Sequence, residues 1–392
     1  MRLVRLLVLL FSGVVIFMAH NHKSFAAEAE AVQASYKVGE GLKIGNETSQ
    51  IAIKTMLQSR FTYEGLEGAP NTDTFAVQKG EIKAEGYVME KKLRFGLGLN
   101  VATRSRATTT AVCTNAGCTS TANAVTAEST SGLDTLNDFY FDWVPTSQNF
   151  GIKGGQYKVP FLMQELTSSV KQQFVDRAIA TDPFNFKRDL GITFHGSVME
   201  SPLTYAVFVM NGDGANTINR NKSVLTGVRF ELPILGTYVA SESDTEYSEN
   251  HNLGVGAAYA FNEAAAAVQA GTIAADTKAN HGTLDVGYKY QGWSFQGAGM
   301  LTKTMEGASV TNYGYNAQVG KFLIPKHLEV AARADGLIFD GAAANQYEYS
   351  TGLNYFIVGH GIKLQSDYAV LLNSRGQDLN DHRIRVQMQV VF

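Results

Sequence analysis

Basic residues gather in a short stretch near the middle of the chain, between residues 158 and 188. This stretch holds five basic residues and three acidic ones, a local excess of two positive charges. Lysine and arginine side chains form charge-assisted hydrogen bonds with anions. The candidates for contact with a small anion are therefore Lys158, Lys171, Arg177 and Arg188.

The chain as a whole has the opposite charge. It contains 33 Lys and Arg against 36 Asp and Glu, and removal of a leader that holds Arg2, Arg5 and Lys23 leaves 30 against 36, a net charge of about −6. A chain without a global basic field is not expected to bind nucleic acid. Any preference for anions must come from where individual Lys and Arg side chains lie.

The sequence holds no motif typical of enzymes, such as G-x-S-x-G, H-E-x-x-H or a phosphate-binding glycine loop. The histidines are scattered, at His195, His251, His281, His327, His360 and His382. We therefore expect no enzyme and no cofactor. A barrel-embedded lipid hydrolase with a Ser–His pair on adjacent strands stays as an alternative.

The two cysteines, Cys113 and Cys118, lie close together in a stretch rich in Thr, Ala and Ser. In an exported protein this spacing favours a small disulfide loop. A metal site lacks a nearby His or further Cys, so none is predicted.

Alternation of apolar and polar residues with a period of two dominates the chain and predicts strands with two different faces. In the last strand Ile384, Val386 and Met388 share one face, and Arg383 and Arg385 share the other. We predict sixteen strands, most of them close to the ~9 to 11 residues needed to cross a bilayer at a tilt. Their ranges are 51–63, 75–89, 93–104, 136–144, 150–158, 189–198, 203–211, 224–233, 253–261, 281–290, 293–304, 313–322, 328–338, 347–356, 362–372 and 381–392.

The predicted connections alternate between short and long, as they do in outer-membrane barrels with short periplasmic turns and long outer loops. The sequence therefore predicts an all-β fold, a transmembrane antiparallel β-barrel of about 16 strands. The connection 234–250 breaks the rule, because it falls where a short turn is due but is long and acidic. Either a strand is misplaced there or the chain carries a periplasmic insertion.

Strand parity turns several basic side chains toward the lumen, where a charge avoids the cost of facing lipid. The predicted pore-lining residues are Arg94, Arg104, Lys153, Lys289, Arg333, Arg383 and Arg385. The alternative is an ordinary salt-bridged wall, for which Glu329 and Asp335 near Arg333 would be the partners. Parity places Lys153 and Lys158 on opposite faces, and a bulge before residue 159 would turn Lys158 inward.

The N-terminus has the pattern of a secretory signal peptide. Arg2 and Arg5 precede an apolar run that is too short to span a bilayer, and a small-x-small pattern ends at Ala26. We predict a signal peptide at 1–26, a periplasmic extension without a clear strand at 27–49 and a barrel at 50–392. The extension is too short to be the plug of an energy-coupled receptor.

The long connection 159–188 is predicted to contain a helix. Pro160 ends the preceding strand, Ser168 or Ser169 is a candidate cap, and Val170, Phe174 and Ala178 recur on one face. Such an amphipathic turn packs against the barrel wall and shows its polar side to water.

Several motifs resemble the phosphate-selective porin O and P family. The matching runs are GQYKVPF at 155–161, ELTSS at 165–169, FVDR at 174–177, RDLGI at 188–192, and NY at 354–355 with GHGIKLQSDY at 359–368. This resemblance implies a 16-stranded barrel, usually trimeric, whose third outer loop folds inward to narrow the pore. It also implies a channel for small ions in which Lys and Arg attract anions.

We therefore expect an outer-membrane porin for passive diffusion of small solutes, anion-leaning and in one version selective for phosphate. Phosphate preference needs a close run of Arg and Lys donors, which the sequence does not reveal, so general anion diffusion is the favoured form. The alternative is a non-conducting structural or adhesive barrel. The expected partners are small anions, outer-membrane lipid and lipopolysaccharide, the barrel assembly machinery, which would read the terminal Phe392, and two further copies in a homotrimer.

Overall fold

The structure is a computed structural model of the 392-residue chain. It describes residues 31–102, 110–111, 121–122, 136–145, 149–199, 201–219, 223–237, 241–262, 278–305, 309–340, 344–374 and 378–392. Residues Ala34–Phe392 form one compact unit. The predicted signal peptide, Arg104, Cys113 and Cys118 lie outside the described residues.

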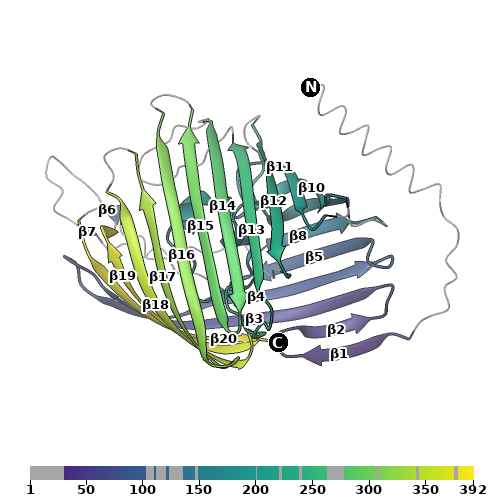
Figure 1. Cartoon of the computed structure of the whole chain (residues 1–392), viewed down its shortest axis with the longest axis horizontal. Coiled ribbons are helices and arrows are strands. Elements are labelled where there is room, and N and C mark those ends of the chain that lie inside the picture. Colours follow the sequence, from purple (N-terminus) through teal and green to yellow (C-terminus); the bar gives the residue numbers. More distant parts are fainter. Residues whose placement is uncertain are drawn as a thin grey trace. The chain divides into compact units, whose positions relative to one another are not determined.

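Sixteen strands form a closed antiparallel barrel (Figure 1). Each strand pairs with the next along the chain, and the ring closes where β20 pairs with β3 from Val391↔Met56 to His382↔Gly65. The strands are β3 (Gln50–Gly65), β4 (Thr72–Val88), β5 (Leu93–Asn100), β8 (Leu136–Trp143), β9 (Gly151–Lys158), β10 (Arg188–Ser197), β11 (Thr204–Met210), β12 (Leu225–Leu235), β13 (Asn252–Asn262), β14 (Ala279–Tyr290), β15 (Trp293–Thr304), β16 (Thr311–Ile324), β17 (Leu328–Ile338), β18 (Gln346–Val358), β19 (Ile362–Leu372) and β20 (Asp381–Val391). All sixteen predicted strands are confirmed, and the third ends at Asn100, before Arg104.

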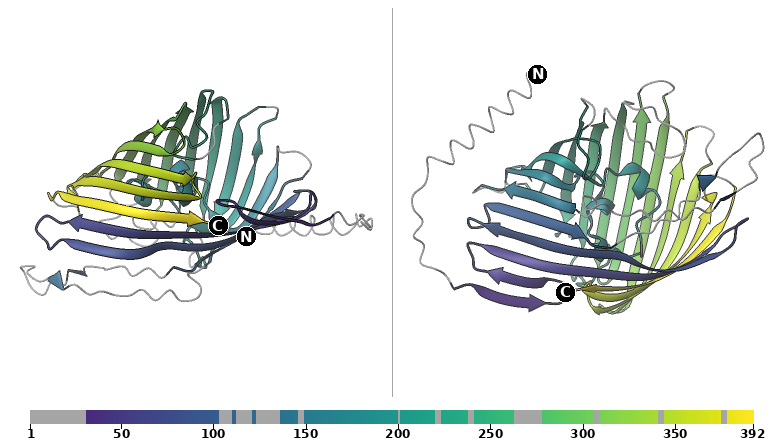
Figure 2. Two further views of the ribbon diagram at one scale, coloured as in Figure 1. Left: turned by 90° about the horizontal axis from the view of Figure 1, so that it is seen from below. Right: turned by 180° about the vertical axis from the view of Figure 1, so that it is seen from behind.

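Among the described residues, four short strands lie outside this ring. β6 (Thr110–Ala111) and β7 (Thr121–Ala122) pair only with each other. β1 (Gln33–Lys37) and β2 (Gly41–Gly45) form a hairpin beside the barrel strands (Figure 2), and β2 pairs with β3 from Leu42↔Ile53 to Gly45↔Gln50.

The prediction that residues 27–49 hold no clear strand was therefore wrong. The pairing of β20 with β3 begins only at Met56, so the first residues of β3 keep free backbone groups on that edge, and β2 takes them. Gly39 and Gly41, with φ of +83° and +79°, supply the left-handed conformations of the turn that brings β2 back.

The two faces of the barrel wall differ in chemistry. On β20, Arg385 and Gln387 are buried, whereas Ile384, Val386 and Met388 are exposed. The same alternation of buried polar and exposed apolar side chains recurs on β16 to β19. An apolar outer face and a polar lumen are the pattern of a membrane barrel. Among the described residues, no helix has the length and apolar character needed to cross a bilayer.

The connections at one end of the barrel are longer than those at the other. The end that holds the C-terminus carries short turns such as 291–292 and 325–327, while the opposite end carries 159–187 and 263–278. The exception is again 236–251, which joins β12 to β13. Because these two strands pair directly from Leu225↔Asn262 to Leu235↔Leu253, no strand is misplaced there. The connection is an insertion.

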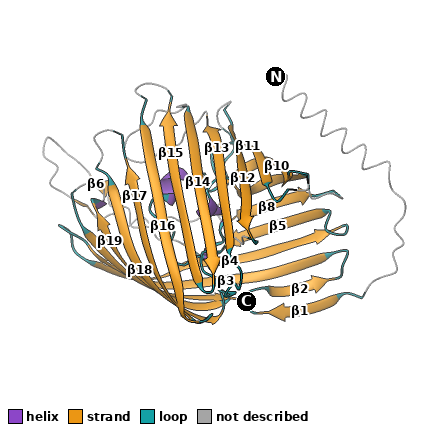
Figure 3. Cartoon of the chain, viewed as in Figure 1, coloured by secondary structure: helices purple, strands orange, loops and turns teal. Residues whose placement is uncertain are grey.

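The segment 159–187 between β9 and β10 contains three short helices, shown in purple in Figure 3: α2 (Met163–Leu166), η1 (Ser169–Lys171) and α3 (Thr181–Phe184). The predicted single helix with Val170, Phe174 and Ala178 on one face was wrong, because the chain between η1 and α3 is not helical. Ser168 precedes η1 without a side-chain cap hydrogen bond. The predicted helix does not form because the backbone of this segment makes contacts with the barrel wall instead.

Candidate functional site

Backbone groups of the segment 159–187 bind to polar side chains of the barrel wall. The Val175 N–H donates to Asp367 Oδ2 at 3.1 Å, and the Ile179 N–H donates to Asp335 Oδ1 at 2.8 Å. Backbone carbonyls of the segment accept further bonds from Arg60, Arg229, Arg333, Asn354, Lys363, Gln365 and Gln389. Wall side chains thus take the backbone groups that a longer helix would have paired internally.

Asp176 is the charged centre of this contact. Its Oδ2 lies 2.8 Å from the Nη1 atoms of both Arg60 on β3 and Arg385 on β20. Arg333 Nη1 donates to the backbone oxygen of Asp176 at 2.8 Å. The enclosed position favours the protonated carboxyl, but Arg385 and Arg60 outweigh this effect and hold the pKa of Asp176 well below its usual range.

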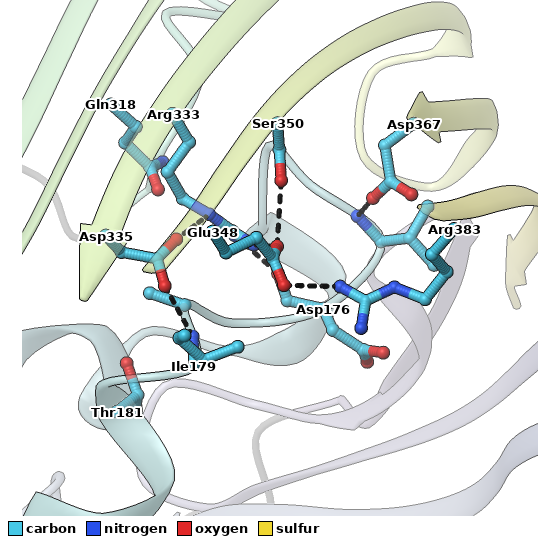
Figure 4. Close-up of polar contacts among 12 residues, drawn as sticks. Asp176, Ile179, Thr181, Gln318, Arg333, Asp335, Glu348, Ser350, Asp367 and Arg383 are labelled. Carbon is cyan, nitrogen blue, oxygen red and sulfur yellow. Dashed lines mark hydrogen bonds and ion pairs between the residues drawn. The ribbon is translucent and has the colours of Figure 1, made fainter. Parts of the chain in front are cut away.

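A buried ion-pair network continues along the wall (Figure 4). Arg333 Nε lies 2.9 Å from Asp335, and Arg333 Nη2 lies 2.7 Å from Glu348. Arg383 Nη2 reaches the other oxygen of Glu348 at 2.6 Å. The salt-bridged wall is therefore present around Arg333, with Asp335 as the predicted partner. Glu329 instead accepts hydrogen bonds from uncharged groups, those of Gln173, Ser243 and Asn354.

A cavity of about 650 Å³ lies between this segment and the strands β3, β4 and β20. Two acidic side chains line it, Asp176 and Asp182. The basic side chains in its lining are Arg60, Lys79, Arg177, Arg383 and Arg385. Five positive charges against two negative ones leave an excess of three at its surface. The remaining lining is largely polar and includes Gln58, Gln78, Ser169, Gln172 and Gln346.

Two of the four predicted anion-contacting residues meet at one carboxylate. Lys158 Nζ lies 3.7 Å from Glu165 Oε1, and Arg177 Nε lies 3.2 Å from Glu165 Oε2. Arg188 pairs with Asp138 at 2.9 Å, on the wall formed by β8. Arg177 alone of the four lines the 650 Å³ cavity. Lys171 ends η1 and is half-buried.

The predicted bulge before residue 159 is absent, because β9 keeps an unbroken register with β10 from Gly151 to Lys158. The irregularity is at Gly155, whose φ of +124° allows Gln156 and Tyr157, neighbours in sequence, both to be buried. Lys158 then reaches back to the carbonyl oxygens of Glu165 and Thr167.

Of the remaining predicted lining residues, Arg383 and Arg385 lie at the cavity, whereas three lie elsewhere. Lys153 Nζ sits 3.7 Å from the centre of the Tyr140 ring and 4.6 Å from that of Tyr157, a cation–π contact. Arg94 lines a second cavity of about 450 Å³ bounded by β10 to β12. Lys289 is buried on β14.

The sequence reasoning missed four charged residues at the cavity: Arg60, Lys79, Asp176 and Asp182. Parity alone would have found Arg60, since it shares a strand face with Gln58 and alternates with Leu57 and Phe61. Asp176 gave no such signal, because its position depends on contacts made far along the chain. Among the described residues, no group of three or more His, Cys, Asp or Glu could hold a metal ion.

A closed barrel of sixteen strands with a polar interior and an apolar outer face defines a transmembrane channel of the porin type. The family model described as "Phosphate-selective porin O and P" matches residues 70–392, and the chain belongs to this family. It is an outer-membrane channel protein.

Solved structures share the fold at low sequence identity. The anion-selective porin from Comamonas acidovorans aligns with a TM-score of 0.56 and 10% identity, over 88% of this chain and 100% of that one. OmpT, an outer-membrane protein of Vibrio cholerae, aligns at 0.54 and 8%, over 88% and 99%. The outer-membrane channel DcaP of Acinetobacter baumannii aligns at 0.53 and 11%, over 90% and 100%. No curated protein matches the chain.

Proposed function

We propose that the protein is a water-filled pore for small solutes, that the segment 159–187 is its third outer loop, and that this loop narrows the channel. The observation that carries the proposal is the cavity of about 650 Å³ between Asp176 and Arg177 on the segment and Arg60, Arg383 and Arg385 on the wall. Permeating solutes pass through this polar space, because hydrogen bonds fix the other side of the segment to β15, β16, β17, β18 and β19.

The pore prefers anions. Five basic and two acidic side chains line the cavity, and the excess raises the local concentration of anions.

The preference is for anions in general and not for phosphate. Each cavity guanidinium is already engaged by protein: Arg60 and Arg385 by Asp176, Arg383 by Glu348 and Arg177 by Glu165. A phosphate-selective site needs several converging donors that the protein leaves free. Guanidinium groups that are already paired attract anions through their long-range electrostatic potential, but they do not offer several free N–H donors to a single phosphate.

Planar-bilayer recording tests this function, with Arg383→Gln as the variant. Glu348 keeps Arg333 as a partner in this variant, so no buried carboxylate is left alone. A unit charge in water is worth about 1 kcal/mol at 4 Å, so the anion-to-cation permeability ratio should fall about fivefold.

Lys92→Gln is the matched control. It removes the same charge from an exposed position in the turn between β4 and β5, and it should leave the ratio unchanged. Absence of discrete conductance steps from the wild-type protein would favour the structural or adhesive barrel instead.

We also propose export through a cleaved signal peptide at 1–26, embedding in outer-membrane lipid and lipopolysaccharide, and assembly as a homotrimer. A trimer form is described for OmpT of Vibrio cholerae, which shares the fold. Phe392 and Thr55 exchange two backbone hydrogen bonds at 2.6 and 2.9 Å, so the terminal residue belongs to the seam that closes the barrel. This position supports the role of Phe392 as a signal to the assembly machinery.

The channel is favoured over a lipid hydrolase. Ser241 Oγ lies 3.2 Å from His360 Nε2, but the hydroxyl donates its proton to the Ser243 carbonyl at 2.9 Å. A serine nucleophile must instead donate to its histidine base. Hydrolysis of a lipid ester by the purified protein would instead support the lipid hydrolase.

A further inference from the structure

The insertion between β12 and β13 enters the barrel and meets the segment 159–187. β12 ends and β13 begins at the end of the barrel that holds the C-terminus, while the segment 159–187 starts from the opposite end. The two nevertheless share hydrogen bonds, and residues Ser241, Glu242, Ser243 and Asp244 of the insertion are buried. Two connections from opposite ends therefore meet within the ring of strands.

Glu242 forms the contact. Its N–H donates to the Lys171 carbonyl at 3.0 Å, and its Oε2 accepts the Gln173 N–H at 2.8 Å. Its Oε1 accepts from Gln164 Nε2 at 3.2 Å, and Gln318 Nε2 donates to Oε2 at 3.1 Å. With 3% of its surface exposed, Glu242 is committed to these partners. They include residues on both sides of η1.

The insertion is itself fixed to the wall. Ser243 Oγ donates to Glu329 Oε2 at 2.8 Å, and Glu329 also accepts from Gln173 Nε2 at 2.8 Å, so one carboxylate holds both connections. Asp244 accepts the N–H of Gly292 at 2.8 Å, which ties the insertion to the neighbouring turn between β14 and β15.

The contact lies away from the proposed pore. No residue of 241–250 lines the 650 Å³ cavity, whose wall residues come from β3, β4, β17, β18 and β20. The insertion occupies the part of the lumen that faces β14 to β17, as its bonds to Gly292, Gln318 and Glu329 show.

We propose that residues 241–251 of the insertion position the segment 159–187 from the far end of the barrel, with Glu242 as the positioning residue, and so confine permeation to the 650 Å³ cavity. This inference rests on the proposed pore. Two of the acidic residues of the insertion, Glu242 and Asp244, are thereby explained by contacts that hold the constriction in place.

Single-channel recording of Glu242→Ala tests the inference. Without the hydrogen bonds of Glu242, residues 164–173 are free to move. Conductance should therefore rise on the order of twofold with added open-channel noise, as expected for a wider, less rigid constriction. Glu246→Ala is the matched control, since it removes the same charge from an exposed position in the same insertion. Glu242→Gln keeps an acceptor for the Gln173 N–H and should restore conductance close to that of the wild type.

Limited trypsin digestion of the folded protein gives a readout that does not depend on conduction. Glu242→Ala should be cut at Lys171 or Arg177 at least tenfold faster than the wild type or Glu246→Ala. Unchanged digestion and unchanged conductance in Glu242→Ala would overturn the inference while the pore stands. If the wild-type protein never conducts, the proposed pore function is wrong. The digestion experiment would still decide whether Glu242 positions the segment 159–187.

Discussion

Asp176 decides how much of the positive charge at the cavity is available to ions. Its carboxylate neutralises part of Arg60 and Arg385, each 2.8 Å away. Both arginines keep other acceptors, because Arg60 also bonds Gln387 and Arg385 also bonds Asp367. Neutralising Asp176 therefore exposes charge to the pore without leaving either guanidinium unpartnered.

We predict that Asp176→Asn raises the anion-to-cation permeability ratio about threefold to fivefold, since it removes one negative charge beside the ion path. The measurement is the reversal potential in a KCl gradient. Glu90→Gln, which loses a charge in the exposed turn between β4 and β5, should match the wild type. A fall in the ratio would contradict the assignment of the cavity as the ion path.

The pH dependence follows from the lowered pKa of Asp176. A carboxyl with a depressed folded-state pKa makes its contribution at every pH above its unfolded pKa of about 3.9, and loses it only as the pH falls through the lower folded value. The difference in reversal potential between the wild type and Asp176→Asn should thus persist from pH 7 down to pH ~4.5. Its disappearance near pH 5.5 would show that Arg60 and Arg385 do not hold this carboxyl.

At the scale of elements, the ion pairs of β17, β18 and β20 make this wall rigid. Arg333 is fully buried between Asp335 and Glu348, so Arg333→Met leaves buried carboxylates short of a partner. We predict a loss of about 3 to 5 kcal/mol in the free energy of unfolding, measured by denaturant titration in detergent. Arg94→Met, at an exposed position of β5, should cost less than 1 kcal/mol, roughly the scale of a surface charge. Equal losses in the two variants would argue against a wall held by this network.

The end of β9 depends on a single glycine. A Cβ on Gly155 would lie 2.2 Å from the Phe139 carbonyl oxygen, and the φ of +124° is one that other residues rarely adopt. Gly155→Ala should therefore destabilise the barrel by more than the ~1 to 3 kcal/mol of backbone strain alone, seen as a lower temperature for loss of the folded band on an unheated gel. Gly299→Ala in β15, where a Cβ meets nothing within 4 Å, should fold as the wild type does.

The same contrast between elements explains what the sequence could predict. Strands such as β17 and β20 can be predicted from the sequence, because lipid on one side and the polar lumen on the other impose an alternation of apolar and polar residues with a period of two. The conformation of the segment 159–187 cannot be predicted in this way, because it depends on Asp335, Asp367 and other wall groups more than 150 residues away in sequence. Its basic residues were identified, but their partners Glu165 and Asp138 follow only from the three-dimensional structure.

At the scale of the whole molecule, the barrel is closed by its last strand. β20 joins β3 along ten residue pairs, and Phe392 adds its backbone bonds to Thr55 at the end of the seam. Deletion of Phe392 should reduce the amount of folded protein in the outer membrane, measured against total protein in isolated membranes. Phe392→Tyr, which keeps the ring and the backbone bonds, should assemble normally. Normal assembly of the deletion variant would contradict the role of Phe392 as an assembly signal.

The most direct test of the account is the zero-current potential of the wild-type protein in a planar bilayer under a tenfold KCl gradient, repeated with potassium phosphate. The five basic and two acidic side chains around the cavity predict an anion-selective potential in chloride, with phosphate admitted but without strong block of the chloride current. A cation-selective potential would contradict the assignment of this cavity as the constriction that selects ions.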